Sequence, residues 1–345
     1  MTEVHKMSED TKDSNASASA FGWDFQCNAA IVLTLKYIKD HLKGVKLEGK
    51  KEDIEIYFDD GTTIYSQAKS FQVVNEDSNG SEKFKEALKT LNEANKEGNV
   101  KALIYVTNND VNPFGQRDNQ IDRRTTIPFS RLSIKNQERW KKFIDEQGYN
   151  LGNYDNFIIE IIPFNGPDEE NKYKIIRRSL EDFLDSSLNT DKHSKKILES
   201  LQNRFFHNAT EKDREVSLSK KDVVWSIIVV YCQSQQDFID DDYFENDFNG
   251  DESLKEIVRD KYEEVMKSAC NKFELASKAY MEFDDYKSIA QKTIKDFVRE
   301  KWKIFENDFS CVEDDYRQMV IFAVIDQILR NRKIITGVKK YVGGL

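Results

Sequence analysis

Proline and glycine are scarce in this chain of 345 residues, which contains only 4 prolines and 14 glycines. These two residue types usually make up roughly 12 % of a globular protein, more than twice their share here. All four prolines and ten of the glycines lie before residue 168. The scarcity excludes a collagen-like chain and a Pro-rich linker protein, and the asymmetry excludes a repeated all-β architecture. It favours a turn-containing N-terminal part followed by a long helical part.

Cysteine motifs and cofactor motifs are also absent. The four cysteines are far apart and form no CxxC pair, which argues against a zinc knuckle or a disulfide scaffold and for a reducing compartment. No Walker A, GxGxxG or GxSxG pattern occurs, so an ATPase, a dinucleotide enzyme and a serine hydrolase lack support. The polar N-terminus lacks the apolar region of a signal peptide, and no window approaches the ~18 apolar residues of a membrane span. We therefore expect a soluble, cytoplasmic protein with no membrane partner.

The composition that is present indicates a folded, acidic protein. Hydrophobic residues make up 39 % of the chain and include 22 Phe, enough to fill a sizeable core. With 52 basic and 62 acidic residues, the net charge of −10 provides no global basic field for nucleic acid. A nuclease needs only a local basic groove, however, so this charge does not exclude one. The length allows about two domains.

The first half of the chain reads as a short disordered tail, 1–19, followed by an α/β domain over 20–168. Its expected order is α-β-β-α-β-loop-α-β, with the loop over 109–130. Period-two alternation on both sides of an Asp-Asp-Gly-Thr turn predicts a β-hairpin. Two runs that are apolar on both faces predict buried strands. The expected helices cover 23–41, 80–97 and 133–147, and the expected strands after the hairpin cover 100–109 and 156–164. This pattern predicts a mixed sheet flanked by helices.

The second half, 169–345, reads as a purely helical domain for partner binding or oligomerisation. A long seam of apolar residues over 253–283 predicts the core of a helical bundle or, alternatively, a dimeric coiled coil. We expect the acidic run over 236–252 to be a solvated loop. A calcium loop is the alternative, although the run lacks the DxDxDG order of such loops. The other expected helices cover 177–188, 191–206, 219–235, 286–307 and 312–332.

The hairpin contains the residues that can carry chemistry. Asp53 precedes the first strand, while Gln67 and Lys69 lie two apart on the second and therefore share a face. An acid, a second acid or amide, and a lysine on one hairpin face form the arrangement of PD-(D/E)xK nucleases. Phosphodiester hydrolysis needs a hard cation such as Mg²⁺ or Mn²⁺, which prefers oxygen ligands, and a lysine can stabilise the developing charge. Glu48 lies close by in the sequence.

The turn geometry decides whether this site can exist. A two-residue loop at Asp60-Gly61 would place Asp53 on the face opposite Lys69. A three-residue loop, with Gly61 in the left-handed conformation, places Asp53 on the face of Gln67 and Lys69. We therefore predict the three-residue loop. The alternative for the whole cluster is an ordinary solvated sheet face.

Basic side chains elsewhere are candidates for contacts with DNA. One group lies in the long loop after the predicted central strand, and the other lies on the helix over 133–147. Phosphate binding needs only such local charge, although a solvated helix face explains the second group equally simply. The candidates are Arg123, Arg124, Arg139, Lys141 and Lys142.

Four segments of the first half together resemble the double-strand DNA endonuclease domain of bacterial anti-phage effectors. They are FGWDFQCNAAIVL, LEGKKEDIEI, IYSQAKSFQ and ALIYVTNN, and they match a family pattern of Gly-x-x-aromatic-Gln, Glu…Asp, Gln-x-Lys and Thr-Asn. The family includes the nuclease of CBASS systems and the nuclease subunit of Lamassu systems. The absence of a predicted sensing domain after residue 165 makes the Lamassu subunit the better match. The matching residues are Gly22, Phe25, Gln26, Glu48, Asp53, Gln67, Lys69, Thr107 and Asn108.

The resemblance implies a restriction-endonuclease-like fold and a Mg²⁺- or Mn²⁺-dependent deoxyribonuclease. It implies that Asp53, Glu48 and Gln67 hold the metal and that Lys69 is the catalytic lysine, with Gln26 in support. It also implies double-stranded DNA as substrate, an SMC-like ATPase and a third defence subunit as partners, and activation as a homo-oligomer, a tetramer. The alternative is a non-enzymatic scaffold or regulator with a degenerate nuclease domain.

Overall fold

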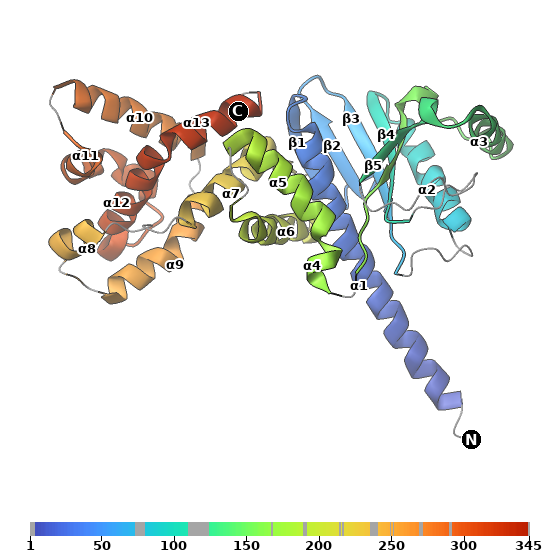
Figure 1. The fold of residues 1–345 in the computed structure, drawn as a ribbon, viewed down its shortest axis with the longest axis horizontal. Coiled ribbons are helices and arrows are strands. Elements are labelled where there is room, and N and C mark those ends of the chain that lie inside the picture. The colour runs from blue at the N-terminus through green and yellow to red at the C-terminus, as the bar shows by residue number, and fades with distance from the viewer. Residues whose placement is uncertain are drawn as a thin grey trace. The chain divides into compact units, whose positions relative to one another are not determined.

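The computed structural model describes residues 4–72, 80–109, 124–166, 168–188, 192–213, 215, 217–234, 241–248, 250, 252–268, 272–289 and 292–343. The chain forms two compact units, coloured by residue number in Figure 1. The first comprises Met1–Phe183 and Gln202–Lys220, and the second comprises Leu184–Leu201 and Lys221–Leu345. The expected single boundary at 168/169 therefore differs from the structure, because the first unit also takes in chain from the half expected to be a separate helical domain.

The first unit is built on a seven-stranded sheet with the order β5-β6-β4-β3-β2-β1-β7. β3 pairs in parallel with β4, and β4 with β6, whereas the remaining pairs are antiparallel. The carboxyl ends of β1, β3, β4 and β6 therefore lie at the same edge. The predicted mixed sheet is confirmed. The strands are β1 (Leu42–Leu47), β2 (Ile54–Phe58), β3 (Thr63–Lys69), β4 (Val100–Thr107), β5 (Thr125–Pro128), β6 (Phe157–Ile161) and β7 (Leu218–Ser219).

Three of these strands were not predicted. β5 lies in the segment expected to be a loop, and β7 lies in the half expected to be purely helical. β1 follows a helix that ends at Tyr37, so the predicted helix to residue 41 is too long. Gly44 explains the pairing of β1 with β7, because a Cβ on Gly44 would lie 2.8 Å from the Leu218 carbonyl oxygen. The missing side chain at Gly44 is therefore what allows β7 to pair with β1.

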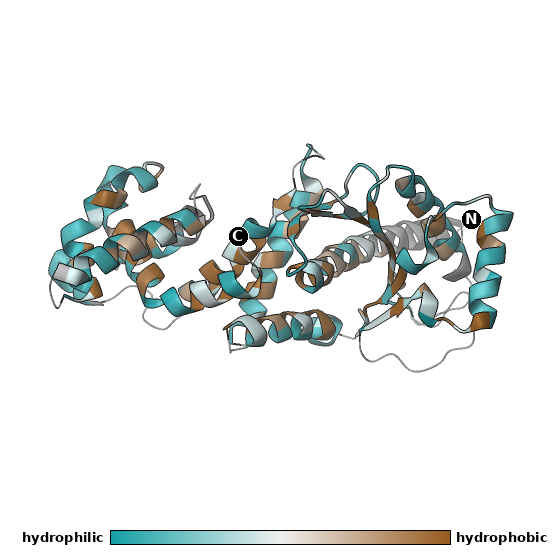
Figure 2. Ribbon diagram, turned by 90° about the horizontal axis from the view of Figure 1, so that it is seen from above, coloured by the Kyte–Doolittle hydropathy of each residue, from teal (hydrophilic) through white to brown (hydrophobic). Residues whose placement is uncertain are grey.

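Helices cover the sheet of the first unit. α1 (Val4–Tyr37) packs against β1, β2 and β3, and it includes most of the residues expected to form a tail. Trp140 of α3 (Ile134–Glu146) and Leu88 of α2 (Gly80–Asn95) join a core cluster with the sheet residues Tyr65 and Tyr105. In Figure 2 the central strands appear brown because of their apolar residues. The remaining helices of this unit are η1 (Phe129–Arg131), η2 (Tyr154–Asn156), α4 (Glu169–Lys172), most of α5 (Lys174–Leu188) and the end of α6 (Ser194–Thr210).

The described residues of the second unit form helices only. α12 runs through its centre and is buried without interruption from Met319 to Leu329. The predicted single helix over 253–283 falls in two helices, α9 and α10. The elements are α7 (Lys220–Gln233), α8 (Asp241–Asp247), α9 (Glu252–Ser268), α10 (Lys272–Ile289), α11 (Ile294–Lys301), η3 (Trp302–Phe309), α12 (Asp314–Arg330) and α13 (Arg332–Tyr341).

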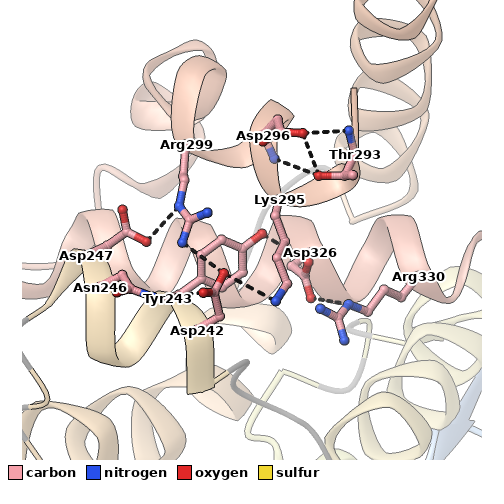
Figure 3. A network of polar contacts seen from close by, with 10 residues as sticks. All are labelled: Asp242, Tyr243, Asn246, Asp247, Thr293, Lys295, Asp296, Arg299, Asp326 and Arg330. Carbon is pink, nitrogen blue, oxygen red and sulfur yellow. Dashed lines mark hydrogen bonds and ion pairs between the residues drawn. The ribbon is translucent and has the colours of Figure 1, made fainter. Parts of the chain in front are cut away.

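A polar network joins α8, α11 and α12 in this unit (Figure 3). Arg299 donates to Asp247 at 2.9 Å and to Asp242 at 3.0 Å. The Tyr243 hydroxyl donates at 3.2 Å to the buried carboxylate of Asp326. These contacts connect the short helix α8 to α11 and α12. The acidic run that was expected to be a loop therefore contains a helix. None of the described helices combines the length and the apolar content needed to cross a membrane.

Candidate active site

The hairpin register places the predicted residues on one face. Ile56 pairs with Ile64 and Tyr57 with Thr63, so Phe58 opposes Thr62 and three residues form the loop. Phe58 N donates to Thr62 O at 3.0 Å, and Gly61 has a φ of +78°. The predicted three-residue loop is therefore confirmed. Continuing the same register, position 53 opposes position 67 at the carboxyl edge of the parallel strands, where α/β sheets commonly bind ligands.

Asp53 lies half-buried at the open end of the hairpin. Its carboxylate accepts hydrogen bonds from the Gln67 side-chain Nε2 and, at 2.9 Å, from the Ala68 main-chain N–H. Burial raises the pKa of Asp53 to about 6, with a further contribution from the negative charge of Glu48. The two donors and the Lys69 charge act in the opposite direction. The loss of hydration at the Asp53 carboxylate thus outweighs the stabilisation that its two donors and Lys69 supply.

Gln26 of α1 connects the two acids that the sequence paired. Its Nε2 donates to Glu48 Oε1 at 2.7 Å and to the Asp53 main-chain oxygen at 3.1 Å. Glu48 has a φ of +48°, a left-handed conformation that is uncommon for a residue other than glycine. Gln26 therefore supports the site from the helix, as the resemblance implies.

A tight turn between β1 and β2 carries both acids. Glu48 N donates to Asp53 O at 2.8 Å, which closes the turn. The Glu55 carboxylate accepts from the main-chain N–H of Lys51 at 2.7 Å and of Glu52 at 3.1 Å. Gly49 lies directly against Glu55, since a Cβ there would be 2.3 Å from its carboxylate. The turn is therefore held by Glu55, a residue that sequence reasoning did not single out.

Gln67 and Lys69 extend from β3 toward α2. The Thr90 hydroxyl of α2 lies 2.8 Å from Gln67 Oε1, so Gln67 presents its nitrogen to Asp53 and its oxygen to Thr90. Lys69 is half-buried, and its Nζ lies 3.7 Å from Glu86 Oε2. In this arrangement Gln67 positions the Asp53 carboxylate, and the ion pair that Lys69 forms within the described part of the chain is a long one.

Glu52 is the buried acid that sequence reasoning missed. It is 4 % exposed, and neither carboxylate oxygen has a hydrogen-bond partner in the described part of the chain. Burial and the charge of Asp53 raise the pKa of Glu52 to about 8. The signal available in the sequence was its position beside Asp53, but residues in a turn do not alternate between faces as strand residues do.

The donors at this edge fit a hard divalent cation. Among the described residues, no group of three or more His, Cys, Asp or Glu side chains is arranged to hold a metal. Asp53 and Glu48 supply two carboxylates, and Mg²⁺ often binds through one or two carboxylates while retaining several waters. The raised pKa of Asp53 and the unpartnered oxygens of Glu52 indicate an excess of acid that a cation would offset. Gln67 would have to turn its amide to contribute an oxygen.

The basic residues proposed to contact DNA separate into three groups. Arg124 donates from Nε to the fully buried carboxylate of Glu160, which Lys36 Nζ also contacts at 2.8 Å, so Arg124 has a structural role. Arg123 lies outside the described residues. The exposed face of α3 carries Arg139, Lys141 and Lys142, while Trp140 between them is buried in the core.

Asn108 at the end of β4 ties two strand ends together. Its side chain accepts from Phe71 N at 2.8 Å and donates to Phe71 O at 2.8 Å. It also donates to Asn165 Oδ1 at 2.9 Å. The Thr-Asn pair of the resemblance therefore fixes the chain beyond Lys69, and Asn108 does not reach Asp53 by any hydrogen bond of the described residues.

Comparison with known proteins finds similarity only among solved structures. No family model and no curated protein matches. The chain is similar to the Acinetobacter baumannii Cap4 SAVED/CARF-domain containing receptor with the cyclic trinucleotide 2'3'3'-cAAA, at 12 % identity and a TM-score of 0.40, over 61 % of this chain and 44 % of that chain. The Moraxella osloensis Cap4 receptor matches at 12 % identity and a TM-score of 0.38, over 61 % and 47 %. This chain thus spans less than half the length of these receptors. TM-scores this low establish no shared function, so the proposal below depends on the residues of this chain.

Proposed function

We propose that the first unit is a metal-dependent endonuclease that hydrolyses phosphodiester bonds of double-stranded DNA, as the effector of a bacterial anti-phage system. The observation that carries this proposal is the position of Asp53, Gln67 and Lys69 on one hairpin face beside Glu48. A solvated sheet face would not bury Glu52 and leave its carboxylate without a hydrogen-bond partner among the described residues.

In this proposal Asp53 and Glu48 hold Mg²⁺ or Mn²⁺, while Gln67 and Gln26 fix their orientation. The bound cation supplies polarisation of the phosphoryl oxygen and lowers the pKa of an attacking water. Lys69 stabilises the charge that develops on the phosphoryl oxygens, as a compact cation can. The exposed basic side chains of α3 contact the DNA backbone.

Cleavage of supercoiled plasmid with Mg²⁺ or Mn²⁺ tests the reaction. We expect nicked and linear products with the wild-type protein, and a loss of about 100-fold or more with Lys69→Ala or Asp53→Ala, as for other preorganised electrostatic groups. Lys89→Ala is the matched control, because Lys89 is an exposed lysine of the same helix as Glu86. Active Lys69→Ala protein would contradict the assignment.

Metal binding gives a second measurement that does not require turnover. Titration calorimetry should show Mn²⁺ binding to wild-type protein and none to an Asp53→Ala, Glu48→Ala double variant. This matters because the resemblance implies that assembly into a tetramer, with an SMC-like ATPase and a third subunit, switches the nuclease on. If the assembled protein neither binds the metal nor cuts DNA, the alternative of a scaffold with a degenerate nuclease domain is favoured.

A further inference from the structure

A cavity of the first unit is lined by α1 residues that neighbour Gln26 in the helix. Its volume is about 560 Å³, within the usual range of small-molecule sites. Gln26 contacts Glu48 of the proposed active site, whereas Trp23 and Cys27 line the cavity. Successive helix residues are separated by roughly 100°, so Cys27 points in a different direction from Gln26. The lining residues are Ala20, Trp23, Asp24, Cys27, Asn28, Tyr173, Gln202, Asn203, Phe206 and Thr210.

Two exposed aromatic rings stand in this cavity. Trp23 is 38 % exposed and Phe206 is 51 % exposed, the two largest apolar side chains that the first unit presents to solvent beside Ile134. Their ring centroids lie 6.4 Å apart, in an edge-to-face arrangement. Large aromatic side chains are usually buried on folding, because their exposure forfeits a large hydrophobic gain. Each ring therefore leaves a flat apolar surface on which a planar ligand can stack.

The cavity has no uncompensated charge in its lining. Asp24 forms an ion pair with Lys172, and it accepts from the Tyr173 hydroxyl at 2.9 Å. Lys172 in turn lies 5.1 Å from the centroid of the Phe164 ring. Burial raises the pKa of the Cys27 thiol to about 12, so the thiol is neutral. A phosphate or another strong anion finds no free cation in the described lining.

The polar groups that face the cavity are amides. Gln202 Nε2 donates at 2.8 Å to Asn28 Oδ1, which leaves the Gln202 carbonyl oxygen as an acceptor. Asn203 is exposed, and its side chain makes no hydrogen bond within the described part of the chain. A side-chain amide offers both donors and acceptors and can pair with a ring edge that does the same.

We propose that this cavity binds a neutral heteroaromatic ring of the nucleobase type, stacked on the face of one of the two rings Trp23 and Phe206, with its edge against the other ring. Its polar edge is held by Asn203 and Gln202. The chemistry is shared by a free nucleoside and by an unpaired base of single-stranded DNA. The exposed rings supply the stacking surface, the amides recognise the polar edge, and the absence of a free cation in the described lining favours the base over its phosphate. The proposal does not depend on the nuclease activity.

Fluorine NMR of protein labelled with 5-fluorotryptophan tests it directly. The chain has 4 tryptophans, and Trp23→Phe identifies the Trp23 signal. We expect adenosine, guanosine, cytidine or thymidine to shift the Trp23 signal while the signals of the buried Trp140 and Trp225 stay in place. A short single-stranded oligonucleotide, and the same oligonucleotide with abasic sites, distinguish the two sources of the base.

The experiment distinguishes a free nucleoside from an unpaired base as the ligand. Saturable shifts with a nucleoside assign a free ligand, and shifts only with the base-bearing oligonucleotide assign an unpaired base. Phe206→Ala should weaken either interaction at least about fivefold, the lower end of base–aromatic stacking. Ile134→Ala is the control, because Ile134 is exposed but lies outside the cavity. The proposal is wrong if no base moves the Trp23 signal, if the abasic oligonucleotide acts equally, if Phe206→Ala binds normally, or if N-acetyl-phenylalaninamide shifts Trp23 as strongly.

Discussion

Gln67 donates a hydrogen bond to the carboxylate of Asp53, and this pair lies across the hairpin at the edge of the sheet. In the proposed active site, the amide thus stands where PD-(D/E)xK nucleases can carry a second acid. It compensates part of the Asp53 charge, yet burial still raises the pKa of Asp53 to about 6. A change of charge at Gln67 should therefore alter the response of the protein to a cation bound beside Asp53.

The first prediction concerns Gln67→Glu. In chelator, the variant should be less stable than wild type by about 1–3 kcal/mol, because Asp53 loses a donor and gains a like charge. Mg²⁺ should then raise the melting temperature of the variant more than that of wild type, since a ligand that binds only the folded state stabilises it. Thermal unfolding with and without Mg²⁺ measures both effects. Equal responses to Mg²⁺ would show that no cation lies beside Gln67.

The second prediction concerns the pH dependence set by Glu52. The pKa of Glu52 is raised from its ordinary value of 4.5 to about 8 in the folded protein. Between these two pH values, Glu52 is protonated in the folded protein but ionised in the unfolded chain. Stability should therefore fall as pH rises through this interval, by at most about 1.4 kcal/mol for each unit of the shift. Glu52→Gln should flatten the decrease. Urea unfolding in chelator at several pH values measures the free energy of unfolding of both proteins. If this free energy depends on pH equally in wild type and in Glu52→Gln, the pKa of Glu52 is not raised by folding.

The third prediction tests the turn that carries the acids. Gly49→Ala should cost roughly 1–3 kcal/mol, because the new methyl group overlaps the Glu55 carboxylate. In a Glu55→Ala background the same change should cost much less, since the overlapping group is gone. A double-mutant cycle of unfolding free energies gives this coupling. Additive effects would mean that Gly49 and Glu55 act independently.

The fourth prediction separates the basic residues. Arg124→Ala should lower stability by about 1.5–3 kcal/mol, because it removes one charged partner of the buried Glu160 carboxylate while Lys36 remains. Lys142→Ala should leave stability unchanged and, if α3 contacts phosphate, should weaken DNA binding and reduce its salt slope by about one. Unfolding and salt-dependent binding assays on both variants distinguish these roles. A loss of DNA affinity with Arg124→Ala at unchanged stability would reverse the assignment.

Local patterns predicted the parts of the fold that depend on neighbours in sequence. The alternation around Asp59–Gly61 predicted the hairpin but left two loop lengths open, and the requirement that Asp53 share a face with Lys69 selected the three-residue loop that the structure has. β7 could not be predicted, because two residues carry no periodicity and their pairing depends on the close approach at Gly44. Glu52 was missed because its burial is produced by the surrounding tertiary structure, which a turn sequence does not encode.

The final prediction uses the loop length itself. Deleting Asp60 leaves Asp59 and Gly61 as a two-residue loop and keeps Phe58 opposite Thr62, so Asp53 still faces Gln67 and Lys69. Glu48 N and Gln26 continue to hold Asp53. The deletion variant should therefore fold, as judged by circular dichroism, and bind Mn²⁺ as tightly as Asp60→Ala. Asp60→Ala is the control, because it removes the 2.9 Å bond to Thr62 N but keeps the loop length. Loss of Mn²⁺ binding in a folded deletion variant would show that the metal depends on the loop itself and not on the pairing that places Asp53 opposite Gln67.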